Sequence, residues 1–474
     1  MILSVRSPDP TVLTPPNPCP GLFYTTAAQD GYLIRIRVPG GLLTSQQCRV
    51  LVGVSDPLGN GAIDVTNRAN LQIRGLAEPL PDLLLSQLQQ VKLAAPFSQV
   101  DHLRNIMASP LAGIDPAQLM DTRPLVRDLD QYLSSQPALA GLPAKFSVGI
   151  DGGEQVSIRQ QPNDVRLSAV QVDGEAEAYF QLSLPNRAEP ILLKSSHAVA
   201  AVAAIAQAYR KSLEPGSKSR LKQVMQTLGS QAFLERVQAD LSFPFLYNAA
   251  SRSPSSANFV APIGIFPQAQ VGRFALGIAL PLGRLQVVQL QQIVNLADGY
   301  GSGSLRLTPW RSLILTDIAK ADLPRVQQQV EELGLSTAKT SIWSGLIACS
   351  GTTGCASSLT DTQTDAKAIA AELDRLDSPL TIHFSGCPKS CAHHGSSDLT
   401  LVGAASNHYH LYIGGLESPF GRQLAINLSP ADLPAKINQL LAVYQKQRSH
   451  SSQSFREFVD RYSLAQLQAW LEGR

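Results

Sequence analysis

YLIRIRVPGG (residues 32–41) and FALGIALPLG (residues 274–283) open two segments that share one pattern. Residues 32–73 align with residues 274–315 without a gap, at a constant offset of 242 (274 − 32). Further along, GNGAIDVTNRANLQI (residues 59–73) corresponds to GSGSLRLTPWRSLIL (residues 301–315). A match of this length indicates that one supersecondary unit occurs twice. We therefore expect a duplicated protein of two halves with pseudo-twofold symmetry.

Each repeat is typical of a strand, a helix and a further strand. The YLIRIRV segment alternates apolar with polar residues, which is the period of a half-buried strand. Thr44 can cap a helix that we expect to run to about Val54. Residues 63–74 again alternate, so we predict one strand there, with Arg68 and Arg74 on the same face.

The regions between and after the repeats suggest an α+β protein with several parts. A longer stretch of mixed helix and strand character separates the repeats, and a cysteine-containing stretch follows the second repeat in the same way. We predict five parts, at residues 15–80 (first half-repeat), 90–245 (first α/β lobe), 259–325 (second half-repeat), 336–445 (cysteine lobe) and 450–474 (C-terminal helix).

The composition is that of an ordinary globular protein. The chain has 474 residues, 44% of them hydrophobic and 16% charged, with a net charge of +2. This balance argues against nucleic acid or an anionic membrane as partner, and no apolar run is long enough for a membrane span. The N-terminus lacks the apolar core of a signal peptide, and six cysteines are too few for a secreted disulfide scaffold. We expect a cytoplasmic protein.

Four cysteines in the last third form two close pairs. Five residues separate Cys349 from Cys355, and three separate Cys387 from Cys391. Four thiolates from two loops are the usual ligands of a [4Fe–4S] cluster. Structural zinc sites favour two to four residues between paired cysteines, which argues against zinc. Zinc, and cysteines that are unligated or joined in disulfides, remain as alternatives.

The order of half-repeat, lobe, half-repeat and cysteine lobe, with this cysteine spacing, resembles the sulfite/nitrite reductase superfamily over nearly the whole chain. The resemblance implies two ferredoxin-like half-repeats and two α/β lobes. It also implies that the cysteine pairs hold a [4Fe–4S] cluster beside a tetrapyrrole, with the last cysteine bridging to the iron of a sirohaem in the reductases. The family's basic positions for the tetrapyrrole and a small anion correspond to Arg68, Arg74, Arg104 and Lys145.

Arginine suits such a site because its guanidinium binds carboxylates through two donors and keeps its charge. For any single arginine, a solvated strand face is the simpler explanation. Trp310 stands at the repeat position of Arg68 (310 − 68 = 242), which places the expected tetrapyrrole side in the first half. No catalytic residue can be assigned from the sequence.

Within the superfamily, four stretches most resemble precorrin-3B synthases. They are residues 17–23 around Cys19, residues 105–115, residues 303–313 and residues 385–403. This resemblance implies a monooxygenase of aerobic cobalamin biosynthesis that converts precorrin-3A to precorrin-3B by meso hydroxylation and γ-lactone formation. It would use O2, electrons from a ferredoxin or an NAD(P)H-linked reductase, and a mononuclear non-haem iron. His383, His393 and His394 are plausible iron ligands by type, although no two-histidine, one-carboxylate set stands out.

Two other functions remain open. The first is a ferredoxin-dependent sirohaem reductase acting on nitrite or sulfite. Sulfite reductases have a Lys-Phe-Lys pattern where this chain has Lys145, Phe146 and Ser147, and the missing cation counts against sulfite more than against nitrite. The second is a non-catalytic protein that keeps the cluster, or zinc, in a duplicated scaffold. Such a scaffold would not need the basic residues.

Overall fold

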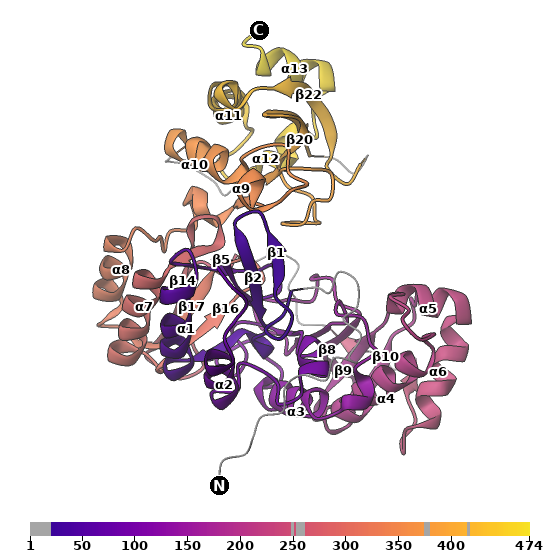
Figure 1. Cartoon of the computed structure of the whole chain (residues 1–474). Helices are drawn as coiled ribbons and strands as arrows, with labels where there is room; N and C mark the ends of the chain where they lie inside the picture. The colour runs from indigo at the N-terminus through magenta and orange to yellow at the C-terminus, as the bar shows by residue number, and fades with distance from the viewer. Residues whose placement is uncertain (1–19, 248–250, 253–260, 374–379, 415–417) are drawn as a thin grey trace.

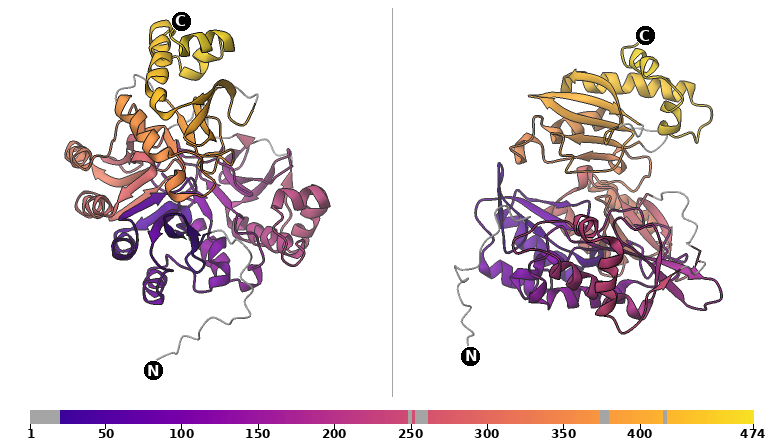
Figure 2. Two further views of the ribbon diagram at one scale, coloured as in Figure 1. Left: turned by 45° about the horizontal axis from the view of Figure 1, so that its top comes forward. Right: turned by 90° about the vertical axis from the view of Figure 1, so that its right-hand side faces the viewer.

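The computed structural model describes residues 20–247, 251–252, 261–373, 380–414 and 418–474 (Figure 1). Cys19 and the first residues of the predicted half-repeats at 15–80 and 259–325 lie outside this part of the chain. The cysteine-containing C-terminal part lies above the rest of the molecule, and the view turned by 90° shows the same arrangement (Figure 2). The two half-repeats and the first lobe form the lower body (Figure 1).

The two half-repeats have the same elements. The first contains β1 (Thr26–Ala28), β2 (Gly31–Ile36), β3 (Leu42–Thr44), α1 (Ser45–Leu58), β4 (Ala62–Val65), β5 (Leu71–Leu76) and α2 (Asp82–Gln90). The second contains β13 (Gly264–Pro267), β14 (Arg273–Ile278), β15 (Arg284–Gln286), α7 (Val287–Tyr300), β16 (Ser304–Leu307), β17 (Leu313–Ala319) and α8 (Leu323–Glu332). From the start of β2 to the start of β5, every boundary recurs 242 residues later, as 273 − 31 shows for β2 and β14. The predicted duplication is confirmed.

The halves exchange a strand. β3 pairs with β16 of the second half, and β15 pairs with β4 of the first. The resulting sheets have the orders β1-β2-β5-β4-β15 and β13-β14-β17-β16-β3. Helices α1 and α7 pack against each other, and one hydrophobic core contains residues of both halves. Neither half can therefore complete its sheet without the other.

Local chemistry explains where the first helix begins. The Thr44 hydroxyl accepts a hydrogen bond from the Gln47 backbone N–H (3.2 Å), and the Gln47 side chain accepts one from the Thr44 N–H (2.9 Å). This capping box satisfies two backbone donors at the helix start. Cys48, Leu51 and Val54 recur at helical spacing on the inner face and are fully buried. The predicted helix is thus present and continues beyond Val54 to Leu58.

Residues 63–74 differ from the prediction of a single strand. They form the end of β4, a turn, and the start of β5, which pair with each other antiparallel. The Thr66 hydroxyl accepts from the N–H groups of Arg68 (3.3 Å) and Asn70 (3.2 Å), and Ala69 has a φ of 53°. The apolar alternation continues in phase across this turn, so periodicity alone does not reveal it. Arg68 therefore lies in the turn and Arg74 in β5, not on one strand.

The duplication extends to the two lobes. In the first, the elements are β6 (Ile106–Ala108), α3 (Arg123–Ser134), β7 (Val148–Asp151), β8 (Val165–Val172), β9 (Ala178–Ser183), β10 (Ile191–Lys194), α4 (Ala198–Lys211), α5 (Leu221–Leu228), α6 (Ser230–Ala239), β11 (Leu246–Tyr247) and β12 (Ser251–Arg252). In the second, they are β18 (Leu346–Ala348), α9 (Gly351–Gly354), α10 (Thr362–Glu372), β19 (Ile382–Ser385), β20 (Leu399–Ala405), β21 (His408–Ile413), β22 (Arg422–Leu428) and α11 (Leu433–Gln447). In both sheets three neighbouring strands, β6-β7-β8 and β18-β19-β20, are parallel, and an antiparallel strand follows.

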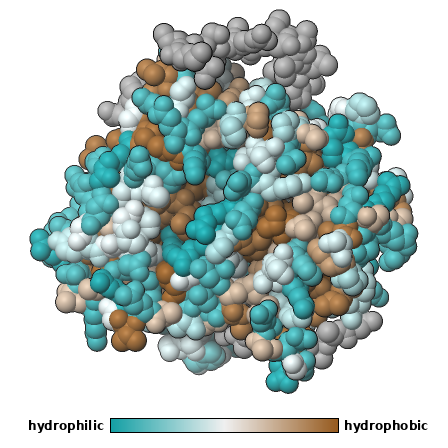
Figure 3. Space-filling model, turned by 90° about the horizontal axis from the view of Figure 1, so that it is seen from below, coloured by the Kyte–Doolittle hydropathy of each residue, from teal (hydrophilic) through white to brown (hydrophobic). Residues whose placement is uncertain are grey.

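Residues 450–474, predicted as one helix, contain two: α12 (Phe455–Val459) and α13 (Leu464–Leu471). Ser454 and Ser463 each cap one of them, which explains the break. No helix in the described residues has the length and apolar character needed to cross a membrane. On the face seen from below, hydrophilic side chains are interspersed with small hydrophobic patches (Figure 3).

Candidate functional site

The sheet of the second lobe brings the two cysteine loops together. Cys349 directly follows β18, and Cys387 lies two residues after β19. Since β18 and β19 are parallel neighbours, their carboxyl ends lie at one edge of the sheet. The Cys349 N–H donates to the Phe384 carbonyl oxygen (3.1 Å), which fixes the first loop against the second strand.

All four cysteines are free thiols, three of them partly buried and Cys391 exposed. Burial raises the pKa of the Cys391 thiol, and the nearby thiols of Cys387, Cys349 and Cys355 raise it further. The two cysteine loops lie side by side at one end of the sheet. Such a set fits a [4Fe–4S] cluster, whose binding would require all four thiols as thiolates.

Hydrogen bonds to sulfur are already in place at Cys349. The Gly386 N–H donates to the Cys349 sulfur (3.3 Å), and the Thr362 hydroxyl lies 3.5 Å from it. Such bonds stabilise thiolate charge and tune a cluster. In the part of the chain that is described, no three or more His, Cys, Asp or Glu side chains are grouped to hold a single metal ion. This holds for the four cysteines as well, so the preference for a cluster over zinc rests on their spacing.

The histidines beside the cysteine loops do not form a metal site. His383 lies on β19 and is fully buried, and its ring meets that of His393 edge to face at 5.7 Å. Burial, and then the neighbouring His393 and Arg311, lower the pKa of His383 to about 3. His383 is thus a neutral packing residue behind the second cysteine loop.

Arg74 contacts the first cysteine loop. Its guanidinium forms two hydrogen bonds of 2.9 Å to the carboxylate of Asp30. One of the same nitrogens donates to the carbonyl oxygen of Gly354 (2.5 Å), the residue before Cys355. Arg74 is buried, with 6% of its surface exposed. It therefore joins the first half-repeat to the cysteine lobe.

Arg68 faces the first lobe instead. Its side chain donates to the Asn163 side-chain oxygen (3.1 Å) and the Pro162 carbonyl (3.4 Å). Burial lowers the pKa of its guanidinium, although Arg68 stays partly exposed. Within the described residues, no carboxylate lies at ion-pair distance from Arg68, and the more distant Asp164 carboxylate favours its charged form. Arg68 and Arg74 thus point to different lobes.

The other two predicted basic residues also differ from each other. Arg104 is buried and binds Asp130 through two hydrogen bonds (2.8 and 3.0 Å), and it donates to the Lys92 carbonyl (2.9 Å). Lys145 is exposed. The four predicted basic residues therefore do not share one face. Ser147 is buried, and its hydroxyl lies 3.4 Å from the Asp164 carboxylate.

One arginine at the cysteine loops was not predicted. Arg311, in the turn between β16 and β17, donates to the carbonyl oxygens of Ala348 (3.1 Å) and Ala392 (2.9 Å). These residues directly precede Cys349 and directly follow Cys391. The repeat gives a partial signal, because Arg311 corresponds to Ala69 (311 − 69 = 242) and both have positive φ (59° and 53°). Nothing in the sequence shows what the side chain contacts.

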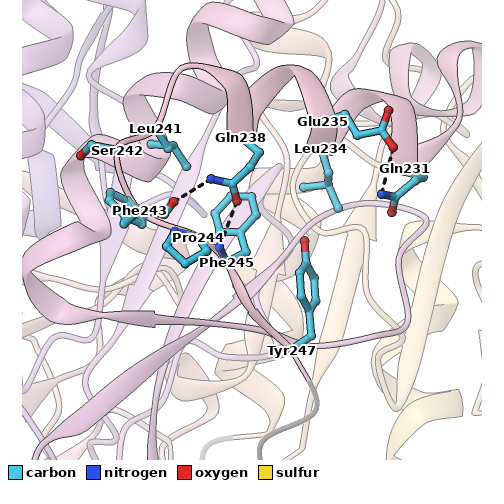
Figure 4. Close-up of a pocket in the computed structure, with 10 residues that line it drawn as sticks. All are labelled: Gln231, Leu234, Glu235, Gln238, Leu241, Ser242, Phe243, Pro244, Phe245 and Tyr247. Carbon is cyan, nitrogen blue, oxygen red and sulfur yellow. Dashed lines mark hydrogen bonds between the residues drawn. The ribbon is translucent and has the colours of Figure 1, made fainter.

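A shallow pocket of about 450 Å³ lies elsewhere, beside α6 in the first lobe (Figure 4). Gln238 crosses it with two hydrogen bonds, to the Phe243 carbonyl (2.6 Å) and from the Phe245 N–H (2.9 Å). None of the predicted site residues lines this pocket. It contains no titratable cluster and is not the candidate site.

Comparison with known families identifies two kinds of domain, each present twice. The "nitrite and sulphite reductase 4Fe-4S domain" matches residues 99–245 and 343–474. The "nitrite/sulfite reductase ferredoxin-like half domain" matches residues 26–90 and 266–333. Together these matches include the strand-exchanged half-repeats and both lobes, and the predicted fold class is confirmed.

Several similar proteins are named as ferredoxin–nitrite reductases. The ferredoxin–nitrite reductase of Synechococcus elongatus is 31% identical over 454 residues, covering 89% of this chain and 88% of that protein. The chloroplastic ferredoxin–nitrite reductase of Zea mays is 31% identical over 408 residues, covering 81% of this chain and 71% of that protein. The structure of the Mycobacterium tuberculosis NirA protein superposes with a TM-score of 0.77 at 24% identity, covering 92% of this chain and 84% of that one.

These findings overturn the expected precorrin-3B synthase activity. The stretches that suggested it, such as residues 385–403, are short segments of the chain. The similarity to nitrite reductases instead extends over most of the chain. A monooxygenase acting on precorrin-3A, a role in cobalamin biosynthesis and a mononuclear iron are therefore not supported.

Proposed function

The chain belongs to the nitrite and sulphite reductase family, and from this premise we propose that it is a ferredoxin-dependent nitrite reductase. The observation that carries the proposal is the similarity to ferredoxin–nitrite reductases along nearly the full length of both chains. The four thiols of the two adjoining loops would supply the ligands that a 4Fe–4S domain requires.

We further propose that Cys349, Cys355, Cys387 and Cys391 hold the cluster and that a sirohaem lies beside it. The cluster would pass single electrons to the sirohaem, whose iron would bind the nitrite. The chain's own residues hold the two loops in place: Gly386 donates to the Cys349 sulfur, and Arg74 binds the carbonyl before Cys355.

Among the predicted basic residues, Arg68 is the best candidate for binding an anionic group. Its guanidinium donates to the neutral oxygens of Asn163 and Pro162, and no described carboxylate lies at ion-pair distance from it. Arg74 and Arg104 already balance their charge with Asp30 and Asp130. Lys145 is exposed and can turn towards a ligand. We therefore propose Arg68 and Lys145 as contacts to tetrapyrrole carboxylates or nitrite, and Arg74 and Arg104 as supporting residues.

Nitrite suits this chain better than sulfite. Sulfite carries two negative charges and nitrite one, so sulfite depends more on the number of cations. Ser147 supplies no charge where sulfite reductases have a second lysine, and its hydroxyl is held beside Asp164. The electron donor would be a ferredoxin, as the names of the similar enzymes state. A cytoplasmic location is proposed because a cluster with thiolate ligands needs a reducing compartment.

The test is turnover by the purified protein under anaerobic conditions. We expect chemically reduced ferredoxin to drive nitrite consumption, and sulfite at the same concentration to react at least tenfold more slowly. NAD(P)H without ferredoxin should give no turnover. Sulfite consumption equal to or faster than nitrite consumption would overturn the choice of substrate, and reaction of neither anion would overturn the proposal.

A further inference from the structure

Arg311 bridges the two cysteine loops from the second half-repeat. One of its terminal nitrogens binds the carbonyl before Cys349 and the other binds the carbonyl after Cys391. The guanidinium therefore spans the first and last of the four cysteines. A planar fork with two separate donors can hold both carbonyls at once, whereas a lysine ammonium is a single point.

The turn that carries Arg311 is held firmly. Its backbone is in the left-handed region, with a φ of 59°. Gly283 lies directly against it: a β-carbon at Gly283 would come within 2.8 Å of the Arg311 β-carbon. The Thr308 and Ser312 hydroxyls, on either side of the turn, lie 2.7 Å apart. The side chain thus starts from a fixed point, which suits a residue that positions others.

The positive charge of Arg311 can interact with the cysteine thiolates. In the described residues no carboxylate lies within ion-pair distance of Arg311, whereas Asp30 neutralises the charge of Arg74. Burial lowers the pKa of the Arg311 guanidinium, while the Asp64 carboxylate and then Cys349 favour its charged form. A cluster bound by four thiolates is an anion that becomes more negative when reduced. A nearby cation stabilises the reduced form and raises the reduction potential.

The duplicated fold supplies a matched arginine remote from the cysteines. Arg306 on β16 is buried, and one of its nitrogens donates to the carbonyl oxygens of Pro110 (3.1 Å) and Ala112 (2.7 Å). These carbonyls follow β6 in the first lobe, as Cys349 follows β18 in the second. Arg306 therefore makes the same type of contact to the lobe that has no cysteine motif.

On the premise that the cluster of the proposed function is present, we propose that Arg311 is a positioning residue for it. The guanidinium fixes the two cysteine loops relative to each other, and its charge raises the cluster's reduction potential. Its role is separate from substrate binding.

The test compares Arg311→Met, Arg311→Lys and the control Arg306→Met by redox titration monitored by electron paramagnetic resonance. Arg311→Met should lower the equilibrium constant for one-electron reduction at least tenfold, a shift of about 59 mV to more negative potential. Arg311→Lys keeps the charge and should stay within about threefold of the wild type. Arg306→Met should leave the potential unchanged. A potential unaffected by Arg311→Met, or shifted equally by Arg306→Met, would overturn the proposal.

A second measurement tests the positioning role. It remains possible even if Arg311→Met loses the cluster, because it uses Arg311→Lys. Iron release to a chelator should be several-fold faster in Arg311→Lys than in the wild type or in Arg306→Lys, because lysine cannot hold both carbonyls. Equal release rates in the two lysine variants would contradict the positioning role. Iron and sulfide analysis of the wild type separates the two proposals: absence of both there would refute the cluster itself, not the role of Arg311.

Discussion

At the scale of single residues, the arginines around the two lobes differ in what balances their charge. Arg74 and Arg104 bind carboxylates, whereas Arg68 and Arg311 bind neutral oxygens. The sequence could predict arginines near the site but not this division, because Asp30 and Asp130 are brought to them only by the fold. The cysteine pairs are candidate cluster ligands on the sequence alone, because their spacing limits what they can bind, and this assignment stays a prediction.

Arg68→Ala should weaken retention of the tetrapyrrole. Loss of one charge-assisted contact costs about 1.5–3 kcal/mol, roughly ten- to a hundredfold in affinity. The measurement is sirohaem retained per chain after dialysis, with iron and sulfide unchanged. Arg123→Ala, which removes an exposed pair with Asp121, serves as the control and should have no effect. Full retention in Arg68→Ala would place the anion-binding site elsewhere.

Cys355→Ser should remove the cluster. A serine hydroxyl does not replace a thiolate ligand, so iron, acid-labile sulfide and broad visible absorbance should all fall to background. Cys48→Ala is the control: Cys48 is buried in the shared core of the half-repeats, and its loss should leave the iron content intact. A Cys355→Ser protein with full iron and sulfide would show that this residue is not a ligand.

Glu154 should make stability depend on pH. Burial, and then the nearby Asp151, raise the pKa of its carboxyl to about 8, above its ordinary value of 4.5. The folded protein therefore keeps a proton that the unfolded chain releases, and stability falls as pH rises from about 5 to 8. At most, this one group lowers the free energy of unfolding by about 1.4 kcal/mol per pH unit. Glu154→Gln should reduce this slope in urea unfolding at pH 5.5 and 8, and identical slopes would contradict the buried, protonated carboxyl.

At the scale of elements, the sequence predicted the first strand of each half-repeat, the helix that Thr44 caps, and the recurrence of one half's elements in the other. It could not predict the turn at Thr66 to Asn70, because the apolar alternation remains in phase across it. The sequence also does not reveal the exchange of β3 and β15. A three-residue strand has the same pattern of apolar and polar residues whichever sheet it joins. Which strands pair is decided only when the two halves pack together.

The short exchanged strands should contribute as much to the stability of the fold as the longer strands. Leu43 on β3 and Leu285 on β15 are buried, at 1% and 3% exposure, in the core shared by the halves. Leu43→Ala and Leu285→Ala should each lower the free energy of unfolding by about 2–5 kcal/mol. Leu83→Ala, at a side chain that is 71% exposed, should change it by less than about 0.5 kcal/mol. Chemical denaturation checks this, and small effects at both buried sites would argue against the exchange.

At the scale of the whole molecule, the two halves share the arrangement of their main strands, but only the second lobe has the cysteine motif. The first residue after β6 is Ser109, whereas the first after β18 is Cys349. The second lobe therefore carries the cysteines that we propose as cluster ligands, and the first half carries Arg68. Residues from both halves meet at the cysteine loops, through Arg74 and Arg311. The architecture was predictable from the repeat and the cysteines, but substrate choice was not, because the local motifs are common to enzymes of different activity.

The most direct test of a nitrite-reducing site is the visible spectrum of the anaerobically purified protein, before and after nitrite is added. A reductase must keep its macrocycle, because the anion binds at the haem iron. We predict sirohaem bands in about one-to-one ratio with the chain, superimposed on cluster absorbance, and a shift of those bands on addition of nitrite. Cluster absorbance without sirohaem bands, or sirohaem bands that nitrite leaves unchanged, would contradict the account.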